Sequence, residues 1–148
     1  MSRHSITLGG VTVDVPTNWR EITDQLEDVA DPPPTLADAA DDVGALQFSV
    51  ARYASGPVPD PTPADLLGMA LQLGATHGLG EPREQIADVG ALRLGAVSYH
   101  DGDTFLRIWY VSDGRSIAKV TYVCPWRLRR KQRATCEAIV RSLRFEPN

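Results

Sequence analysis

The sequence has 148 residues, a net charge of −4, and 43% hydrophobic and 23% charged residues. A chain of this length and composition can bury the core of one globular domain, so we expect a single α+β domain over residues 1–148. The charge is too small to indicate a nucleic-acid or membrane partner. No apolar run approaches the roughly 20 residues that a membrane span needs. Because the residues after Met1 lack the apolar segment of a signal peptide, we expect a cytoplasmic protein.

The first elements in chain order are two strands of a hairpin. Ile6–Leu8 and Val11–Val15 flank Gly9-Gly10, which is typical of a two-residue hairpin turn. Trp19 follows and is expected in a turn or short helix. Residues 45–53 alternate between apolar and polar side chains and predict a further strand.

An acidic, proline-rich loop is expected between these strands, at about residues 24–44, with one helical turn around Leu36–Ala40. From Glu21 to Ala51 there are eight acidic residues and neither Lys nor Arg. Long loops inside compact domains are usually functional or disordered, so this loop is the first candidate for partner binding; a merely solvated loop is the alternative. Its candidate contact residues are Asp24, Glu27, Asp28, Asp31, Asp38, Asp41 and Asp42.

The second half of the chain predicts two helices and a three-stranded meander. Thr62 is expected to cap a helix that has Pro63 in its first position and ends near Gly78, and residues 85–89 predict a short strand. The meander comprises residues 91–100, 103–112 and 115–124, joined at Asp101-Gly102 and at Asp113-Gly114, the pair favoured in type I′ turns. A final helix is expected from about Leu128 to Leu143, with an apolar stripe of Cys136, Ile139, Val140 and Leu143.

The meander has two different faces if both turns are two residues long, so that His100 pairs with Asp103 and Ser112 with Arg115. One face is apolar apart from Arg107 and is expected to be core: Leu92, Leu94, Ala96, Phe105, Trp109, Val111, Ala118, Val120 and Tyr122. The opposite face mixes aromatic, aliphatic and cationic residues, which suits a partner-binding surface. Its candidate contact residues are Arg93, Tyr99, Ile108, Tyr110, Lys119 and Thr121.

Together these elements predict an antiparallel sheet of about six or seven strands with two main helices packed against it. No catalytic constellation is recognisable among them. The three histidines form no metal-binding pattern, and His100 is interpreted as part of a polar hairpin tip. Cys124 and Cys136 form no CxxC pair and are interpreted as small buried residues. The five basic residues within positions 127–133 are interpreted as a solvated helix start rather than a nucleic-acid site. We therefore expect a non-catalytic protein-binding module without metal or cofactor.

The segment Val15-Pro16-Thr17-Asn18-Trp19 resembles the "strand, Pro, x, x, Trp" start of the PsbP/DcrB-like superfamily. The Asp113-Gly114 meander, the Thr121-Tyr122 strand and the closing helix that ends in Ile139–Phe145 continue the likeness in element order. The resemblance implies a mostly non-catalytic fold. Its known members include photosystem subunits, a nuclear-transport factor, Eag-type chaperones of secreted bacterial effectors and small proteins of bacterial toxin loci.

Two roles implied by the resemblance suit a cytoplasmic protein of a bacterium, and both make another protein the partner. The first is an immunity protein that neutralises a cognate secreted toxin, which the acidic loop favours because acidic inhibitors are steered onto basic toxins. The second is an Eag-like chaperone of a secretion-system effector, which the apolar residues of the second meander face favour. A small-ligand-binding protein or an enzyme with an unrecognised pocket is the third alternative. The sequence leaves the oligomeric state open.

Overall fold

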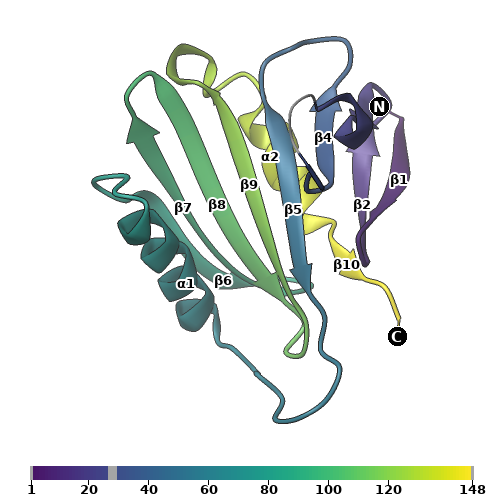
Figure 1. Ribbon diagram of the computed structural model, residues 1–148, viewed down its shortest axis with the longest axis vertical. Helices are drawn as coiled ribbons and strands as arrows, with labels where there is room; N and C mark the ends of the chain where they lie inside the picture. Colours follow the sequence, from purple (N-terminus) through teal and green to yellow (C-terminus); the bar gives the residue numbers. More distant parts are fainter. Residues whose placement is uncertain (1, 27–29, 148) are drawn as a thin grey trace.

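The computed structural model describes residues 2–26 and 30–147, which form two stacked antiparallel sheets and two helices (Figure 1). The larger sheet has the strand order β3-β4-β5-β9-β8-β7-β6 and the smaller sheet the order β1-β2-β10. The α+β class and an antiparallel sheet of about six or seven strands, both expected from the sequence, are confirmed. The first hairpin, however, belongs to the separate smaller sheet, and β3 and β4 extend the larger one. The elements are β1 (Arg3–Leu8), β2 (Val11–Pro16), β3 (Trp19–Glu21), η1 (Thr23–Gln25), β4 (Thr35–Asp38), β5 (Ala45–Ala51), α1 (Pro63–Thr76), β6 (Arg83–Val89), β7 (Arg93–Asp101), β8 (Thr104–Ser112), β9 (Ile117–Pro125), η2 (Trp126–Leu128), α2 (Arg133–Arg141) and β10 (Arg144–Phe145).

The first hairpin forms where its glycines predict it. Leu8 pairs with Val11 across the turn, and Gly9 and Gly10 have φ angles of 51° and 104°, a region that side chains disfavour. Every second residue of β2 is buried, so this hairpin covers one face of the larger sheet.

The segment after this hairpin differs from its prediction. Trp19 begins strand β3 rather than lying in a turn or helix, and residues 35–38 form strand β4 rather than a helical turn. β4 pairs with β3 on one side and β5 on the other, which places Leu36 in the core at 0% exposure. The strand ends at Asp38, whose Oδ1 accepts a hydrogen bond from the backbone N–H of Ala40 at 2.9 Å.

The meander has the predicted faces but a different register. Asp101 pairs with Thr104, and His100 with Phe105 rather than with Asp103. The second turn has four residues, because Ser112 pairs with Ile117 rather than with Arg115. There the carboxylate of Asp113 accepts hydrogen bonds from the backbone of residues 115 and 116 and so holds the longer loop. Each change shifts the register by two residues, and a shift of two leaves every side chain on its predicted face.

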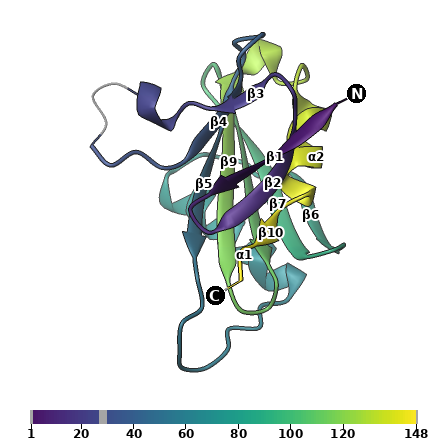
Figure 2. The same ribbon diagram turned by 90° about the vertical axis from the view of Figure 1, so that its right-hand side faces the viewer.

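The two faces of the larger sheet are covered by different elements (Figure 2). The smaller sheet and α2 pack on the inner face, where the predicted core residues are buried apart from the half-buried Leu92, and Arg107 is 2% exposed. Helix α1 packs on the outer face against β6, β7 and β8. Its backbone comes so close to Gly95 that a Cβ atom there would lie 2.1 Å from the amide nitrogen of Leu67. The expected cap of α1 is confirmed: Thr62 and Asp65 bond reciprocally as a capping box.

The last helix is shorter than predicted. α2 begins at Arg133, and residues 126–128 form the separate 3-10 turn η2 instead. Extending the helix back to Leu128 would put most of the basic run on its first turns, where the helix dipole disfavours cations. The predicted apolar stripe is buried, with Cys136, Ile139, Val140 and Leu143 at 0–1% exposure. Neither α1 nor α2, the two α-helices of the described segments, is long and apolar enough to cross a bilayer.

Candidate functional site

The outer face of the larger sheet is covered over only half of its width. α1 lies over β6, β7 and β8 and leaves β5 and β9 without a helix. Of the predicted contact residues, Tyr99 and Ile108 are therefore buried beneath α1, at 1% and 0% exposure. Tyr110, Lys119 and Thr121 remain partly accessible. The accessible part of the predicted sheet-face set is thus smaller than expected.

A groove runs along the boundary between α1 and the open strands, and we call it the α1 groove. It consists of two adjoining hollows that share Met69 and Tyr110. Its walls and floor are formed by Ala64, Asp65, Gly68, Met69, Gln72, Leu73 and Thr76 of α1, Ser49, Val50 and Ala51 of β5, Tyr110 of β8, and Ile117 and Lys119 of β9. The register places Ala51 beside Ile117 and Ser49 beside Lys119.

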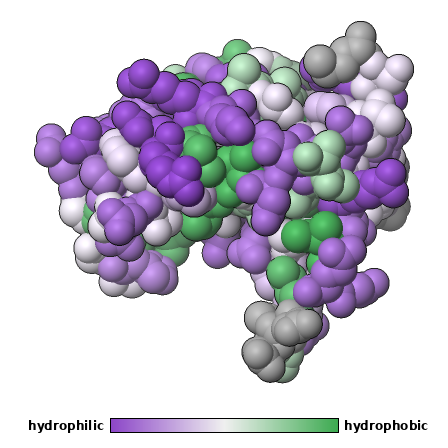
Figure 3. All heavy atoms as spheres, turned by 90° about the horizontal axis from the view of Figure 1, so that it is seen from above, coloured by the Kyte–Doolittle hydropathy of each residue, from purple (hydrophilic) through white to green (hydrophobic). Residues whose placement is uncertain are grey.

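The surface in and beside the groove is mostly apolar. Met69 is 36% exposed, and Val123, farther along the same face of β9, is 46% exposed. Seen from above, the molecule shows separate patches of hydrophobic residues among hydrophilic ones (Figure 3). Lys119 is the cation of the groove, and no carboxylate of the described residues pairs with it. Burial raises the pKa of Tyr110, so its hydroxyl is protonated at neutral pH and can donate a hydrogen bond.

Arg93, also predicted for the sheet face, has a structural partner. Its Nη1 lies 2.6 Å from Asp60 Oδ1 and donates to the carbonyl of Pro61 at 3.0 Å. These contacts fasten the segment that leads into α1 to the start of β7.

Of the predicted acidic residues in the described segments, some contact other residues and others form no ion pair. Asp38 accepts a hydrogen bond from the backbone N–H of Ala40, and the carboxylate of Asp41 lies 3.6 Å from the Lys131 ammonium. Asp24, Asp31 and Asp42 are exposed and form no ion pair with the rest of the described chain. Glu27 and Asp28 lie outside the described residues. The acidic and basic segments therefore neutralise each other in part.

A second concavity, which the sequence does not predict, lies where several arginines gather beside the start of α2. We call it the basic cavity; it is lined by Arg83, Glu84, Ser98, Phe105, Trp126, Arg129, Arg130 and Arg133. His100, interpreted as a polar hairpin tip, stacks on Trp126 beside it, with ring centroids 3.5 Å apart and planes inclined by 7°. These residues come from β6, β7, β8, η2, α2 and the segment between η2 and α2, so only the folded chain brings them together.

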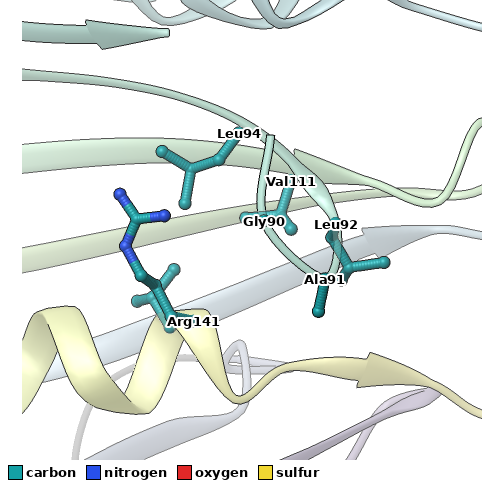
Figure 4. A pocket seen from close by; sticks show the side chains of 7 residues that line it. Gly90, Ala91, Leu92, Leu94, Val111 and Arg141 are labelled. Atoms are coloured by element: carbon teal, nitrogen blue, oxygen red, sulfur yellow. The ribbon is translucent and has the colours of Figure 1, made fainter. Parts of the chain in front are cut away.

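A third hollow, at the edge of the core, is too small to be a ligand site. It lies between the β6–β7 turn, β8 and the end of α2 (Figure 4) and has a volume of about 50 Å³, enough for only a few water molecules. The guanidinium of Arg141 at its rim bonds both carboxylate oxygens of Asp88, at 3.0 and 2.9 Å.

The two cysteines are not placed for nucleophilic chemistry. Cys124 and Cys136 are buried free thiols at 3% and 1% exposure, and burial raises the pKa of each, which disfavours the reactive thiolate. Within residues 2–26 and 30–147, no three His, Cys, Asp or Glu side chains gather where they could hold a metal ion.

Comparisons with known proteins identify the fold. No protein-family model and no curated protein sequence matches the chain. The solution structure of cyanobacterial PsbP from Synechocystis sp. PCC 6803 has a TM-score of 0.61 at 11% identity, over 97% of this chain and 91% of that one. A crystal structure from Bacteroides thetaiotaomicron VPI-5482 has a TM-score of 0.60 at 11% identity, over 93% of this chain but 46% of that chain, so this chain spans about half its length. The likeness shows that the chain has a PsbP-like fold.

Proposed function

We propose that this chain is a non-catalytic protein-binding module whose α1 groove holds an apolar helical segment of another protein, as an effector chaperone does. The observation that carries the proposal is the half-covered outer face, where Met69 of α1 and Val123 of β9 remain exposed. Exposed apolar surface of this kind is common at protein-binding sites.

A helix is favoured over a strand as the occupant of the groove. The floor of the groove is formed by β5, β8 and β9, and each of these strands is already paired on both sides. Their backbone groups are therefore unavailable for strand addition, which requires a sheet edge. A partner must bind there through side chains, and an amphipathic helix can place its apolar face in the groove between α1 and the sheet.

Charge complementarity defines the partner further. Lys119 stands on the groove floor without an ion-pair partner among the described residues. Covering it with an apolar segment would leave a desolvated cation, which is costly. We infer that the partner helix carries an acidic side chain opposite Lys119, in the segment that a bacterial effector would present to its chaperone.

The first experiment tests where the partner binds. A photo-crosslinking residue replaces Ser49, which is exposed in the groove beside Lys119, in the tagged protein expressed in its native host. The same residue replaces Arg127, exposed and outside the groove, as the control. We expect the position 49 variant alone to capture a partner, with the crosslink in an amphipathic helix. Equal crosslinking at both positions, or none at position 49, contradicts the proposal.

The second experiment tests the inferred ion pair with the captured segment. Lys119→Glu should weaken its binding about tenfold, and reversing the charge of the partner's acidic residue should restore the affinity. Arg127→Glu should leave the affinity unchanged. A loss that the partner's reversed charge does not restore contradicts the ion pair.

An immunity role is the second candidate, and the acidic segment is the observation that favours it. Asp24, Asp31 and Asp42 are exposed and have no ion-pair partner within residues 2–26 and 30–147, so their charge is available to steer the chain onto a basic toxin. Reversing these three to Lys should slow association with such a toxin, most strongly at low salt. An unchanged association rate removes the acidic segment from the interface.

A further inference from the structure

The basic cavity concentrates more positive charge than the carboxylates of the described residues neutralise. Its lining contains four arginines and one carboxylate, Glu84, which is ion-paired with Arg133. Arg83 and Arg130 are exposed and have no ion-pair partner in the described part of the chain. α2 begins at the cavity with Arg133 and has no acidic residue in its first turn, so its positive dipole end adds to the same field.

The floor of the cavity supplies a buried hydroxyl group. Ser98 is 1% exposed, and its Oγ accepts a hydrogen bond from Arg107 Nη1 at 2.8 Å. Because this bond uses an acceptor position of Oγ, the Ser98 hydroxyl retains its own proton for donation. The Arg107 guanidinium behind it is buried and ion-paired with Glu137, so it orients the Ser98 hydroxyl and adds no net charge to the cavity.

The backbone of one wall is held in an uncommon conformation. Strand β6 bulges between Arg83 and Ile86, and Glu84 within the bulge has a φ of 51°. Bulges re-aim side chains, and non-glycine residues in the left-handed region concentrate at binding sites. The bulge places two charged side chains of β6 on the cavity wall, where a regular strand would point them to opposite faces.

The opposite wall contains the Trp126 ring, which already stacks with side chains of the same chain. Trp126 is stacked with His100, and the guanidinium of Arg129 lies 4.0 Å from the Trp126 ring centroid. Arg129 also donates to the carbonyl of Trp126 at 2.9 Å. These contacts fix the direction of Arg129 and occupy ring surface on which a base could otherwise stack.

We propose that the basic cavity binds a small, multiply charged oxyanion of the phosphate class. Guanidinium groups match the oxygens of such anions in geometry and charge, and a bound anion relieves the repulsion among the unpaired arginines. This site is separate from the α1 groove, and its test does not depend on the proposed protein partner.

Titration calorimetry of the full chain tests the proposal with inorganic phosphate, pyrophosphate and ADP, each against sodium chloride at matched ionic strength. We expect saturable binding of one anion, tighter for pyrophosphate than for phosphate. ADP should bind no tighter than pyrophosphate, because the stacked Trp126 leaves recognition to the phosphates. Tighter binding of ADP would replace the proposal with a nucleotide site, and no saturable heat at millimolar pyrophosphate overturns it.

Variants distinguish a specific binding site in the cavity from non-specific attraction of anions to a basic surface. Arg83→Gln and Arg130→Gln should each weaken the binding of pyrophosphate about tenfold. Glu84→Gln should strengthen this binding, because it frees Arg133 from its ion pair. Arg127→Gln removes an equal charge from the same basic run but outside the cavity, and should change the affinity less than twofold. Circular dichroism checks that each variant is folded. Equal weakening by Arg127→Gln and Arg130→Gln overturns the proposal.

Discussion

Arg107 and Glu137 form an ion pair across the core between β8 and α2, with Arg107 Nε 2.7 Å from Glu137 Oε1. The Arg107 side chain is 3% exposed and the Glu137 side chain 25%. The other oxygen of Glu137 accepts from the indole N–H of Trp109 at 3.2 Å, and Arg107 Nη1 donates to Ser98 and to the carbonyl of Glu84. The pair therefore connects α2 to three neighbouring strands.

Replacing Glu137 should destabilise the fold strongly. Glu137→Ala removes the counter-charge of a buried guanidinium and the acceptor of the Trp109 indole N–H. We expect the free energy of unfolding to fall by about 3 kcal/mol in urea denaturation. Arg107→Met with Glu137→Leu removes both charges and should recover most of this loss. Glu81→Ala, at an exposed residue, is the matched control and should cost at most about 0.5 kcal/mol. A loss below about 1 kcal/mol for Glu137→Ala would contradict the structural role.

The docking of α1 should depend on Gly95. A methyl group there would meet the backbone of residues 66 and 67 of α1, which cannot move aside without lifting the helix. Gly95→Ala should lower the free energy of unfolding by about 3 kcal/mol, and hydrogen exchange should show weaker protection in α1 than in α2. Gly68→Ala is the control within the same helix, because nothing lies within 4 Å of its Cβ position. It should stabilise the protein by about 0.8 kcal/mol.

Local sequence signals were sufficient for most of the fold. Gly9-Gly10 predicted the β1–β2 hairpin and Thr62 predicted the start of α1, because turn and cap geometry depend on a few neighbouring residues. The faces of the meander were correct although both turns were wrong, since an even shift preserves them. Strand β4 was missed because its short segment lies between prolines and aspartates, and only pairing with β3 and β5 makes it a strand.

The candidate sites were harder to predict because both depend on packing between distant segments. Periodicity showed that α1 has an apolar face, but not which half of the sheet it covers. Gly95 was an available signal, since a glycine inside a strand often marks close backbone approach. The basic cavity joins Arg83 to Trp126 across the sheet, and no local pattern connects these positions.

Stability should fall in acid, in part through Asp88. The hydrogen bonds from Arg141 lower the pKa of the Asp88 carboxyl below its ordinary value. A lowered folded-state pKa contributes stability that is complete above the unfolded value, about 3.9 for aspartate, and is lost as the pH falls through the folded value. The urea midpoint should therefore drop between pH 6 and pH 3, and Asp88→Asn should reduce that drop. Asp42→Asn, at an exposed residue without an ion pair among the described residues, should leave the drop unchanged; an equal effect of both would contradict this role for Asp88.

The two thiols should react only when the protein unfolds. Both are almost fully buried, and burial raises the pKa of Cys124 and of Cys136, so access and thiolate formation are both suppressed. A chromogenic disulfide reagent at pH 8 should modify both cysteines at once in urea and each only slowly, through transient opening, in the native protein. Ala134→Cys places a thiol at an exposed position of α2 and should react at once, which verifies the reagent. Because the opening that exposes Cys136 must separate α2 from the inner sheet face, its slow native reaction should accelerate in parallel with the destabilisation caused by Glu137→Ala. Immediate modification of Cys136 in the native protein would show that α2 is not held against the sheet as described.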